Sequence, residues 1–202
     1  MLQLLTRIDY YAFMGINGLA GKNPFLDGLM KVSCNDHLIP AILGLSLVVM
    51  LLKGKDRQAD RNNIEAVIKV VITVILANAL VQLLGVFTER SRPFVDHPVN
   101  LLFYRPIDSS FPSNPAATSF AFFAAAWYAD RRFSWWLLAP ALLMSFSRIF
   151  TGVCYPGDVL AGIGIAFIAA FGVHRLPFIS RPLTEIGLRI ESRVRTVAAV
   201  RE

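Results

Sequence analysis

Three short stretches of this chain carry residue types that suit phosphate chemistry. They read Ser91-Arg92-Pro93, Phe111-Pro112-Ser113-Asn114-Pro115 and Ser147-Arg148-Ile149-Phe150-Thr151-Gly152-Val153-Cys154-Tyr155-Pro156-Gly157-Asp158. The planar guanidinium fork of arginine matches phosphate oxygens and stays charged at any relevant pH. Arg90 and Arg105 add two more cations close to the first two stretches. The pattern predicts that arginines from separate loops bind one anionic group.

Arg148 is the strongest of these candidates for phosphate binding because it lies at the end of an apolar run. A charge at that depth in a membrane is costly unless it is paired or used, so an ionisable residue there indicates a functional site. The alternative is an arginine whose long side chain reaches up to the membrane surface. The motif residues around Arg148 favour the functional interpretation.

The second stretch leads directly into a predicted helix. Ser113 is a natural N-cap residue, and Pro115 is tolerated in the first turn, whose N–H groups have no partners within the helix. A helix N-terminus also attracts anions, so capping and phosphate binding are compatible. Asp158 is expected to cap the last long helix in a similar way.

Cys154 is the candidate nucleophile of the third stretch. A thiolate beside Arg148 and a helix N-terminus is an able nucleophile, as thiol phosphatases show in principle. A nearby carboxylate, here Asp158, opposes formation of the thiolate. Pro115 has no proton to transfer. His97 is a candidate replacement acid, although a lone loop histidine is more often simply solvated.

The composition indicates a membrane protein. The chain has 202 residues, 55% of them hydrophobic, and a mean hydropathy of +0.53. Several apolar runs approach the length of a bilayer crossing. The formal charge of +6 comes mostly from Lys and Arg at the ends of these runs, which favours membrane topology over nucleic-acid binding. The two cysteines are far apart and indicate neither a disulfide framework nor a zinc site, and no cleavable signal peptide is evident.

The pattern predicts an all-α, polytopic helical bundle with about five transmembrane helices. The expected crossings lie within 25–52, 64–87, 116–128, 133–150 and 159–173. Residues 2–17 are expected to form an interfacial helix or, equally, a packed N-terminal core helix. Residues 1–176 would form the membrane domain and residues 177–202 a basic cytoplasmic tail. The loop 53–62, the turn 130–133 and the tail hold most of the Lys and Arg, so the positive-inside rule places these segments in the cytoplasm. The three motif stretches are then expected on the outer side of a cell membrane.

Together the three stretches resemble the signature of the type 2 phosphatidic acid phosphatase family, to which the vanadium haloperoxidases are related. In that family the second motif usually reads Pro-Ser-Gly-His and the third Ser-Arg-x-x-x-Gly-x-His-x-x-x-Asp. Pro115 and Cys154 stand here in place of the two histidines. The resemblance covers about residues 85–165. It is strongest to the short bacterial branch that hydrolyses undecaprenyl pyrophosphate, through Ser-Phe-Pro-Ser, Ser-Arg-Ile and Tyr-Pro-x-Asp-Val-Leu.

The resemblance implies a nucleophilic histidine, a phosphoenzyme and a second histidine as acid, with no metal or other cofactor. Its phosphate-binding roles fall on residues of all three motifs, namely Arg92, Ser113, Asn114 (backbone) and Arg148. The nucleophile position falls on Cys154, the acid position on Pro115, and the orienting carboxylate on Asp158. Many members have a lysine where this chain has Gly85, and Arg90 is the candidate that supplies that charge.

Two functions therefore remain open. The first is an outward-facing lipid pyrophosphatase whose hydrolysis is impaired by the loss of both histidines. The second is a non-catalytic protein that binds, senses or transports a polyprenyl phosphate or another lipid phosphate. Both readings have a lipid phosphate and the bilayer as partners and no nucleic acid, and neither determines the oligomeric state.

Overall fold

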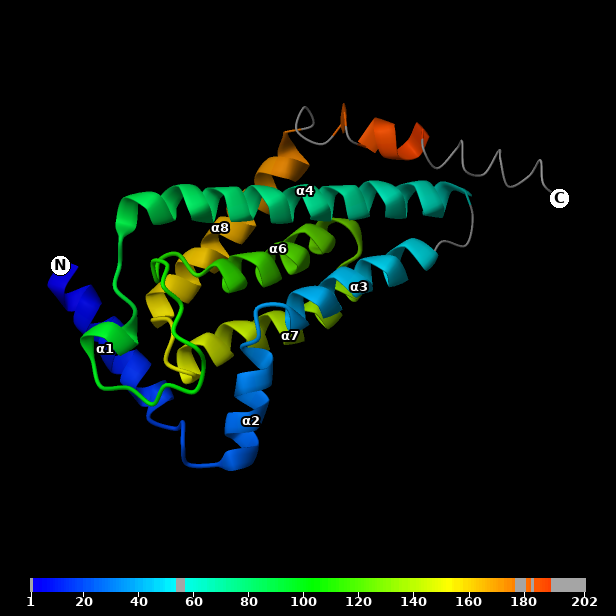
Figure 1. Cartoon of the computed structure of the whole chain (residues 1–202). Helices are drawn as coiled ribbons and strands as arrows, with labels where there is room; N and C mark the ends of the chain where they lie inside the picture. Colours follow the sequence, from blue (N-terminus) through cyan, green and yellow to red (C-terminus); the bar gives the residue numbers. More distant parts are fainter. Residues whose placement is uncertain (1, 54–56, 177–180, 183, 190–202) are drawn as a thin grey trace.

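The computed structural model describes all residues except 1, 54–56, 177–180, 183 and 190–202. All regular secondary structure in the described part of the chain is helical, as predicted (Figure 1). The elements are α1 (Leu2–Asn17), α2 (Pro24–Ser33), α3 (Leu38–Leu52), α4 (Arg57–Thr88), α5 (Pro93–Asp96), α6 (Asn114–Ala129), α7 (Arg131–Phe150) and α8 (Pro156–Arg175). A long loop between α5 and α6 carries part of the second motif.

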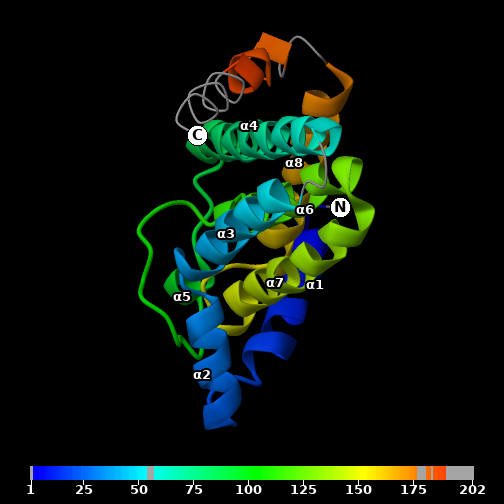
Figure 2. The same cartoon turned by 90° about the vertical axis from the view of Figure 1, so that its right-hand side faces the viewer.

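Helix α6 forms the centre of the bundle. It packs against α4, α7 and α8, and most of its side chains are buried. Figure 2 shows α6 enclosed by these helices, with α2 extending away from the bundle. Alanine dominates the helix, so its neighbours can approach closely. The central position of α6 fixes the place of Ser113 and Asn114, which stand at its start.

Within the described residues, three helical stretches are long and apolar enough to cross a membrane, and they correspond to α4, α7 and α8. A fourth crossing results if α2 and α3, which meet at a bend of 59°, are counted as one span. The remaining predicted crossing, 116–128, coincides with α6, whose 16 residues fall short of the roughly 20 that span a bilayer core. Because α6 is enclosed by other helices, it does not have to meet lipid along its whole length.

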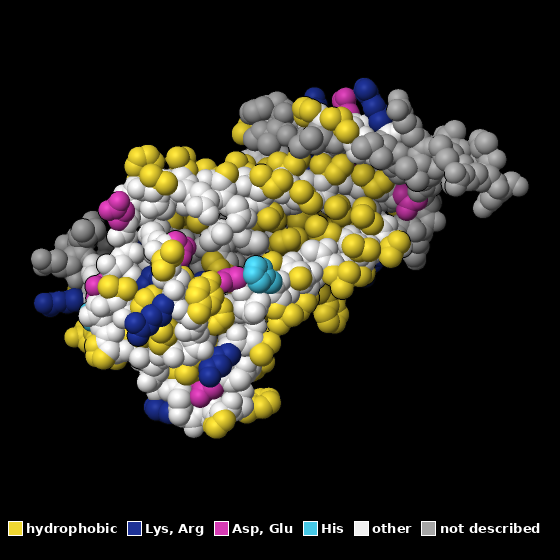
Figure 3. Space-filling view, in the orientation of Figure 1, with side chains coloured by type: hydrophobic (Ala, Val, Ile, Leu, Met, Phe, Trp, Pro, Cys, Tyr) yellow, Lys and Arg dark blue, Asp and Glu magenta, His cyan; other side chains and the backbone are white. Residues whose placement is uncertain are grey.

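Exposed apolar side chains cover the outside of α3 and α4 (Figure 3). Leu45, Val49, Ile75 and Leu83 are all exposed. An apolar surface of this extent is costly in water and normal in lipid. The chain is therefore an integral membrane protein with several apolar helices.

Helix α1 combines the two alternatives expected for it. One face packs into the bundle, where Phe13 is fully buried and Asn17 donates to the carbonyls of Asn100 and Phe150. The other face exposes Ile8 and Tyr11, which suits a membrane interface. The predicted cytoplasmic tail, 177–202, lies largely outside the described residues, so the domain boundary at 176 stays a prediction.

Asp130 joins two helices at the end of the bundle opposite the three motifs. Its carboxylate accepts from the N–H of Phe133 at 3.0 Å and pairs with Lys53 Nζ at 3.0 Å. The Phe133 N–H, aided by Lys53, lowers the pKa of Asp130. This carboxylate therefore stabilises the fold above the ordinary pKa of an aspartate, and the contribution is lost as pH falls through the lowered value.

We expect Asp130→Ala to lower the melting temperature of the purified protein in detergent, because loss of an N-cap costs about 1 kcal/mol. Asp130→Asn retains a capping oxygen and should recover most of the loss at neutral pH. Equal melting temperatures for the alanine variant and the parent would contradict this role.

Candidate functional site

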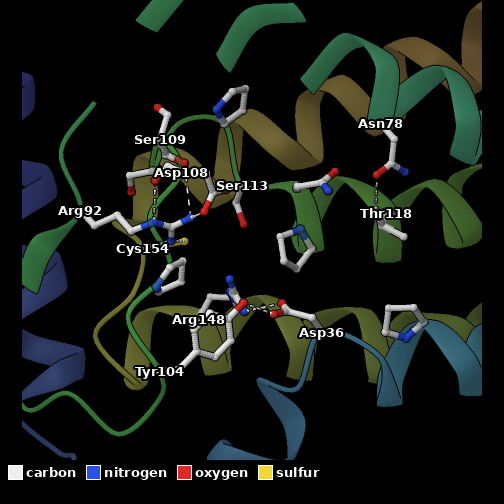
Figure 4. A pocket seen from close by; sticks show the side chains of 16 residues that line it. Asp36, Asn78, Arg92, Tyr104, Asp108, Ser109, Ser113, Thr118, Arg148 and Cys154 are labelled. Atoms are coloured by element: carbon white, nitrogen blue, oxygen red, sulfur yellow. Dashed lines mark hydrogen bonds and ion pairs between the residues drawn. The ribbon is translucent and has the colours of Figure 1, made fainter. Parts of the chain in front are cut away.

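The three motifs meet around one cavity of about 330 Å³. Helix α4, the α2–α3 turn and the loop before α6 complete its wall (Figure 4). The lining residues include Asp36, Arg92, Tyr104, Asp108, Ser113, Asn114, Pro115, Arg148 and Cys154. Six residues singled out in the sequence thus share this wall, from segments as far apart as the start of α5 and the end of α7.

Arg92 is the N-cap residue of α5 and is almost fully buried. Its Nε and Nη2 donate to the carbonyl and carboxylate of Asp108, at 3.0 Å each. Its Nη1 donates to the carbonyl of Val153 at 2.9 Å. These bonds hold the guanidinium in one orientation at the cavity wall, so its positive charge is preorganised for an anion.

Arg148 ends α7 and is 3% exposed. Its Nη1 donates to the carbonyl of Cys34 at 3.1 Å and to Asp36 Oδ1 at 2.8 Å. Its Nε is buried and has no hydrogen-bond partner. A buried donor without a partner is costly, and this one belongs to a side chain that lines the cavity. A ligand oxygen would satisfy it.

Ser113 is the N-cap residue of α6, as the sequence predicts, but its hydroxyl does not cap the helix. Ser113 Oγ and Asn114 Oδ1 are both buried without a hydrogen-bond partner. The first turn of a helix also offers N–H groups that have no partners within it. The start of α6 therefore presents a free hydroxyl and a helix N-terminus to the cavity, which together favour an anion.

Cys154 lines the cavity and is 1% exposed. Its Sγ lies 3.7 Å from Arg92 Nη1. A guanidinium at this distance stabilises negative charge on sulfur. Pro115 lies on the same wall, in the first turn of α6, and offers no titratable group. The cavity thus contains a candidate nucleophile, whereas Pro115, at the position of the family's acid, cannot donate a proton.

Asp158 lies behind the cavity and does not line it. It is fully buried in the first turn of α8, where its carboxylate accepts from the N–H of Tyr155 at 2.9 Å, as expected for a capping residue. The same carboxylate accepts from the hydroxyl of Ser110 and pairs with Arg90 Nη1 at 2.5 Å. Cys154 is not among these partners, so Asp158 holds the motif loops together.

Arg90 is engaged on both sides of its guanidinium. Its second nitrogen, Nη2, pairs with Asp9 Oδ2 at 2.6 Å, and its plane lies over the ring of Tyr155 at 4.3 Å. Arg90 lines a neighbouring cavity of about 770 Å³, together with Arg105 and Gly85, and not the cavity between the motifs. The structure therefore brings Arg92 and Arg148 together and places Arg90 and Arg105 to one side.

Asp36 and Tyr104 are site residues that the sequence alone did not single out. Asp36 lies in the turn between α2 and α3, and its Oδ2 accepts from the hydroxyl of Tyr104 at 2.5 Å. This hydrogen bond, with partial burial, raises the pKa of Tyr104 to about 12. One signal in the sequence could have identified Asp36, because it lies in a polar cluster, 34–37, inside an otherwise apolar run.

One further candidate, His97, lies elsewhere. Its ring contacts the ring of Tyr10, with the centroids 4.4 Å apart and the planes tilted by 45°, and it does not line the cavity. Within the described residues, no group of three or more His, Cys, Asp or Glu side chains is arranged to hold a metal ion. The lining side chains offer guanidinium, hydroxyl, thiol and carboxyl groups.

The comparison with known proteins covers most of the chain. The model of the PAP2 superfamily matches residues 66–182. The undecaprenyl-diphosphatase BcrC of Bacillus subtilis is 32% identical over 91% of each chain. The lipid A 4'-phosphatase of Bacteroides thetaiotaomicron is 28% identical over 91% of this chain and 82% of its own. The crystal structure of Aquifex aeolicus LpxE superposes with a TM-score of 0.63 at 25% identity, over 82% of this chain and 94% of that one.

A second solved structure, a PAP2-type phosphatidylglycerolphosphate phosphatase from Bacillus subtilis, has a TM-score of 0.56 at 18% identity and supports the fold. It covers 86% of both chains. The family model, the curated relatives and the helical architecture all indicate the family that the three motifs resemble. The chain belongs to the PAP2 superfamily of membrane lipid phosphatases.

Proposed function

We propose that this protein binds the head group of a polyprenyl diphosphate, or of a related lipid phosphate, and hydrolyses it slowly through Cys154. The observation that carries the proposal is the meeting of Arg92 and Arg148 at one cavity, where Ser113 Oγ and Arg148 Nε lack partners. Two guanidiniums, a free hydroxyl and a helix N-terminus form a set that suits phosphate oxygens.

A lipid substrate is supported by what adjoins the cavity. A smaller cavity of about 220 Å³ shares Asp108 and Asn114 with it and reaches Val81 and Val86 on α4. A polar cavity next to an apolar helix face suits an amphiphile, with its head group at the arginines and its chain along α4. Relatives named for undecaprenyl diphosphate and for lipid A have substrates of this kind.

The proposed orientation places the cavity at the outer face of the membrane. The end of α3, the start of α4 and the α6–α7 turn, which flank or carry the Lys and Arg of 53–62 and 130–133 in the sequence, lie at the other end of the bundle from the start of α6 and the end of α7 (Figure 1). The positive-inside rule assigns that end, and the tail, to the cytoplasm. A lipid diphosphate would then be bound from the outer leaflet.

Hydrolysis is proposed to be slow because both proton-handling imidazoles are absent. The thiolate of Cys154, stabilised by Arg92, attacks the terminal phosphorus. Loss of general acid catalysis alone costs about 10²–10⁴-fold in rate. A diphosphate tolerates this loss better than a phosphomonoester does, because a leaving phosphate is a weaker base than an alkoxide.

The test is phosphate release from undecaprenyl diphosphate by the purified protein in detergent. We expect slow release that Cys154→Ser abolishes, while the affinity for the lipid is retained. Cys34→Ser is the matched control, because Cys34 is also buried but does not line the cavity. Release that survives Cys154→Ser would exclude the thiol as nucleophile.

The second candidate is a binding protein without hydrolytic activity. It is favoured by Pro115, which cannot protonate a leaving group, and by the engagement of Asp158 with Arg90 and Ser110. Tight lipid diphosphate binding with no phosphate release from the unaltered chain would establish this alternative.

A further inference from the structure

We propose that Asp36 is the proton donor to the leaving oxygen, and that it is freed for this role when the substrate takes its place on Arg148. This inference rests on the proposed hydrolysis at Cys154. It assigns a role to a residue outside all three motif stretches, contributed by the break between α2 and α3.

Asp36 faces the cavity from a wall that the motifs do not supply. Figure 4 shows Asp36, Arg148 and Tyr104 on one side of the cavity, with Arg92 and Ser113 on the other. The side chain of Asp36 is 30% exposed, so it can exchange a proton with solvent. A head group held between the two arginines would therefore lie next to this carboxyl.

The ion pair between Asp36 and Arg148 is suited to exchange. Arg148 Nη1 gives one of its hydrogen bonds to Asp36, while Arg148 Nε has no partner. A phosphate can engage two donors of one guanidinium at once and carries more negative charge than a carboxylate. We therefore expect it to displace Asp36 from Arg148. A carboxyl that loses its guanidinium and faces phosphate oxygens takes up a proton more readily.

Other groups at the cavity are less suited to this step. Tyr104, whose pKa is raised to about 12, keeps its proton at neutral pH and instead donates a hydrogen bond that orients Asp36. Asp108 also lines the cavity, but its side chain is 74% exposed and pairs with Arg92. Pro115 has no proton to give, and Asp158 does not line the cavity. All three guanidinium nitrogens of Arg92 are engaged, whereas Arg148 has a free Nε, so Asp36 is the lining carboxyl that a phosphate can displace from its arginine.

The proposed step balances as follows. The thiolate of Cys154 forms an S–P bond while the bridging P–O bond breaks, and its electron pair stays on the oxygen of the departing lipid phosphate. The carboxyl of Asp36 gives its proton to that oxygen. Water then attacks the phosphorus, the S–P bond breaks to restore the thiolate, and the carboxylate of Asp36 accepts the proton of the water.

The test varies the leaving group, because a proton donor matters most when the leaving oxygen is basic. Rates of the full-length protein and of Asp36→Asn are measured with aryl phosphates, from nitrophenyl to unsubstituted phenyl. We expect Asp36→Asn to change the nitrophenyl rate by less than about 3-fold and to lower the phenyl rate by about 10²-fold. Asp36→Glu should recover part of the phenyl rate. The amide oxygen can still accept from Arg148, and the amide NH2 can donate to the hydroxyl oxygen of Tyr104, so the fold should persist.

A second readout reports the exchange on Arg148. Removal of the competing carboxylate should let inorganic phosphate inhibit Asp36→Asn at a several-fold lower concentration than the parent. Asp108→Asn is the matched control, since it removes the other carboxylate at the wall and should change all aryl esters by one common factor. Equal loss across the ester series in Asp36→Asn would overturn the proposal alone. No phosphate release by the parent, either from any ester or from undecaprenyl diphosphate, would overturn the proposed hydrolysis itself.

Discussion

Replacement of both Pro115 and Cys154 by histidine should raise phosphate release from undecaprenyl diphosphate by at least about 10²-fold. The change restores a nitrogen nucleophile and a proton donor at the two positions where the family has them. Both residues line the 330 Å³ cavity, so the imidazoles have space in front of them. Initial rates of purified proteins in the same detergent are the measurement.

The fold should tolerate this double change. Pro115 lies in the first turn of α6, where a restored N–H meets no intrahelical acceptor and displaces none. Each single variant is the control for the other: Pro115→His adds only an acid and Cys154→His only a nucleophile. Because the two groups act in one reaction, we expect the double variant to exceed the product of the single effects.

The outcome also decides between the two proposed functions. Activity in the unaltered chain that Cys154→Ser removes supports a thiol phosphatase, whatever the double variant does. Activity that appears only in the double variant supports a binding protein with an otherwise intact site. A double variant that binds lipid diphosphate and still releases no phosphate would contradict the expected rate increase.

The sequence was sufficient to predict the helical bundle and the wall of the cavity that the motifs supply. The apolar runs anticipated α4, α7 and α8, and the motif order anticipated that Arg92, Ser113 and Arg148 would meet. These features follow from local patterns, since hydropathy defines the long helices and a motif fixes residue types at short spacing. The apolar run 116–128 also predicts a crossing at α6, but no local sequence pattern predicts that other helices enclose it.

The partners of the arginines were beyond the reach of the sequence. Asp36 contacts Arg148 across 112 positions of the chain, and Asp9 contacts Arg90 across 81. From sequence alone, a carboxylate in a turn or near a terminus is normally interpreted as a solvated residue. Only the packing of α1 and of the α2–α3 bend against the motif loops turns these two aspartates into ion-pair partners.

The structure also separates two kinds of arginine that the sequence treated alike. Arg92 and Arg148 line the cavity, whereas Arg90 joins Asp9 to Asp158 and so links α1 to the start of α8. Asp9 also accepts from the N–H of Gly157 at 2.7 Å. Arg90 therefore positions the third motif, and its contribution to lipid binding is indirect in this geometry.

The largest loss of lipid affinity is expected at Arg148. Its guanidinium is buried at the wall of the cavity that the start of α6 also lines, and its Nε has no partner. Charged hydrogen bonds of this kind are worth about 1.5–3 kcal/mol, or roughly 10–150-fold in affinity. We expect Arg148→Gln to weaken binding of undecaprenyl diphosphate by about 100-fold, measured in a Cys154→Ser background to prevent turnover.

Arg148→Lys separates charge from shape at this position. Lysine keeps the positive charge and the ion pair with Asp36 but offers no planar fork, so its affinity should fall by about 10-fold. Arg132→Gln is the matched control, because it removes one exposed arginine from the opposite end of the same helix. Melting temperatures of all variants report folding. If Arg148→Gln melts like the parent and still binds the lipid with parental affinity, the two arginines do not form the head-group site.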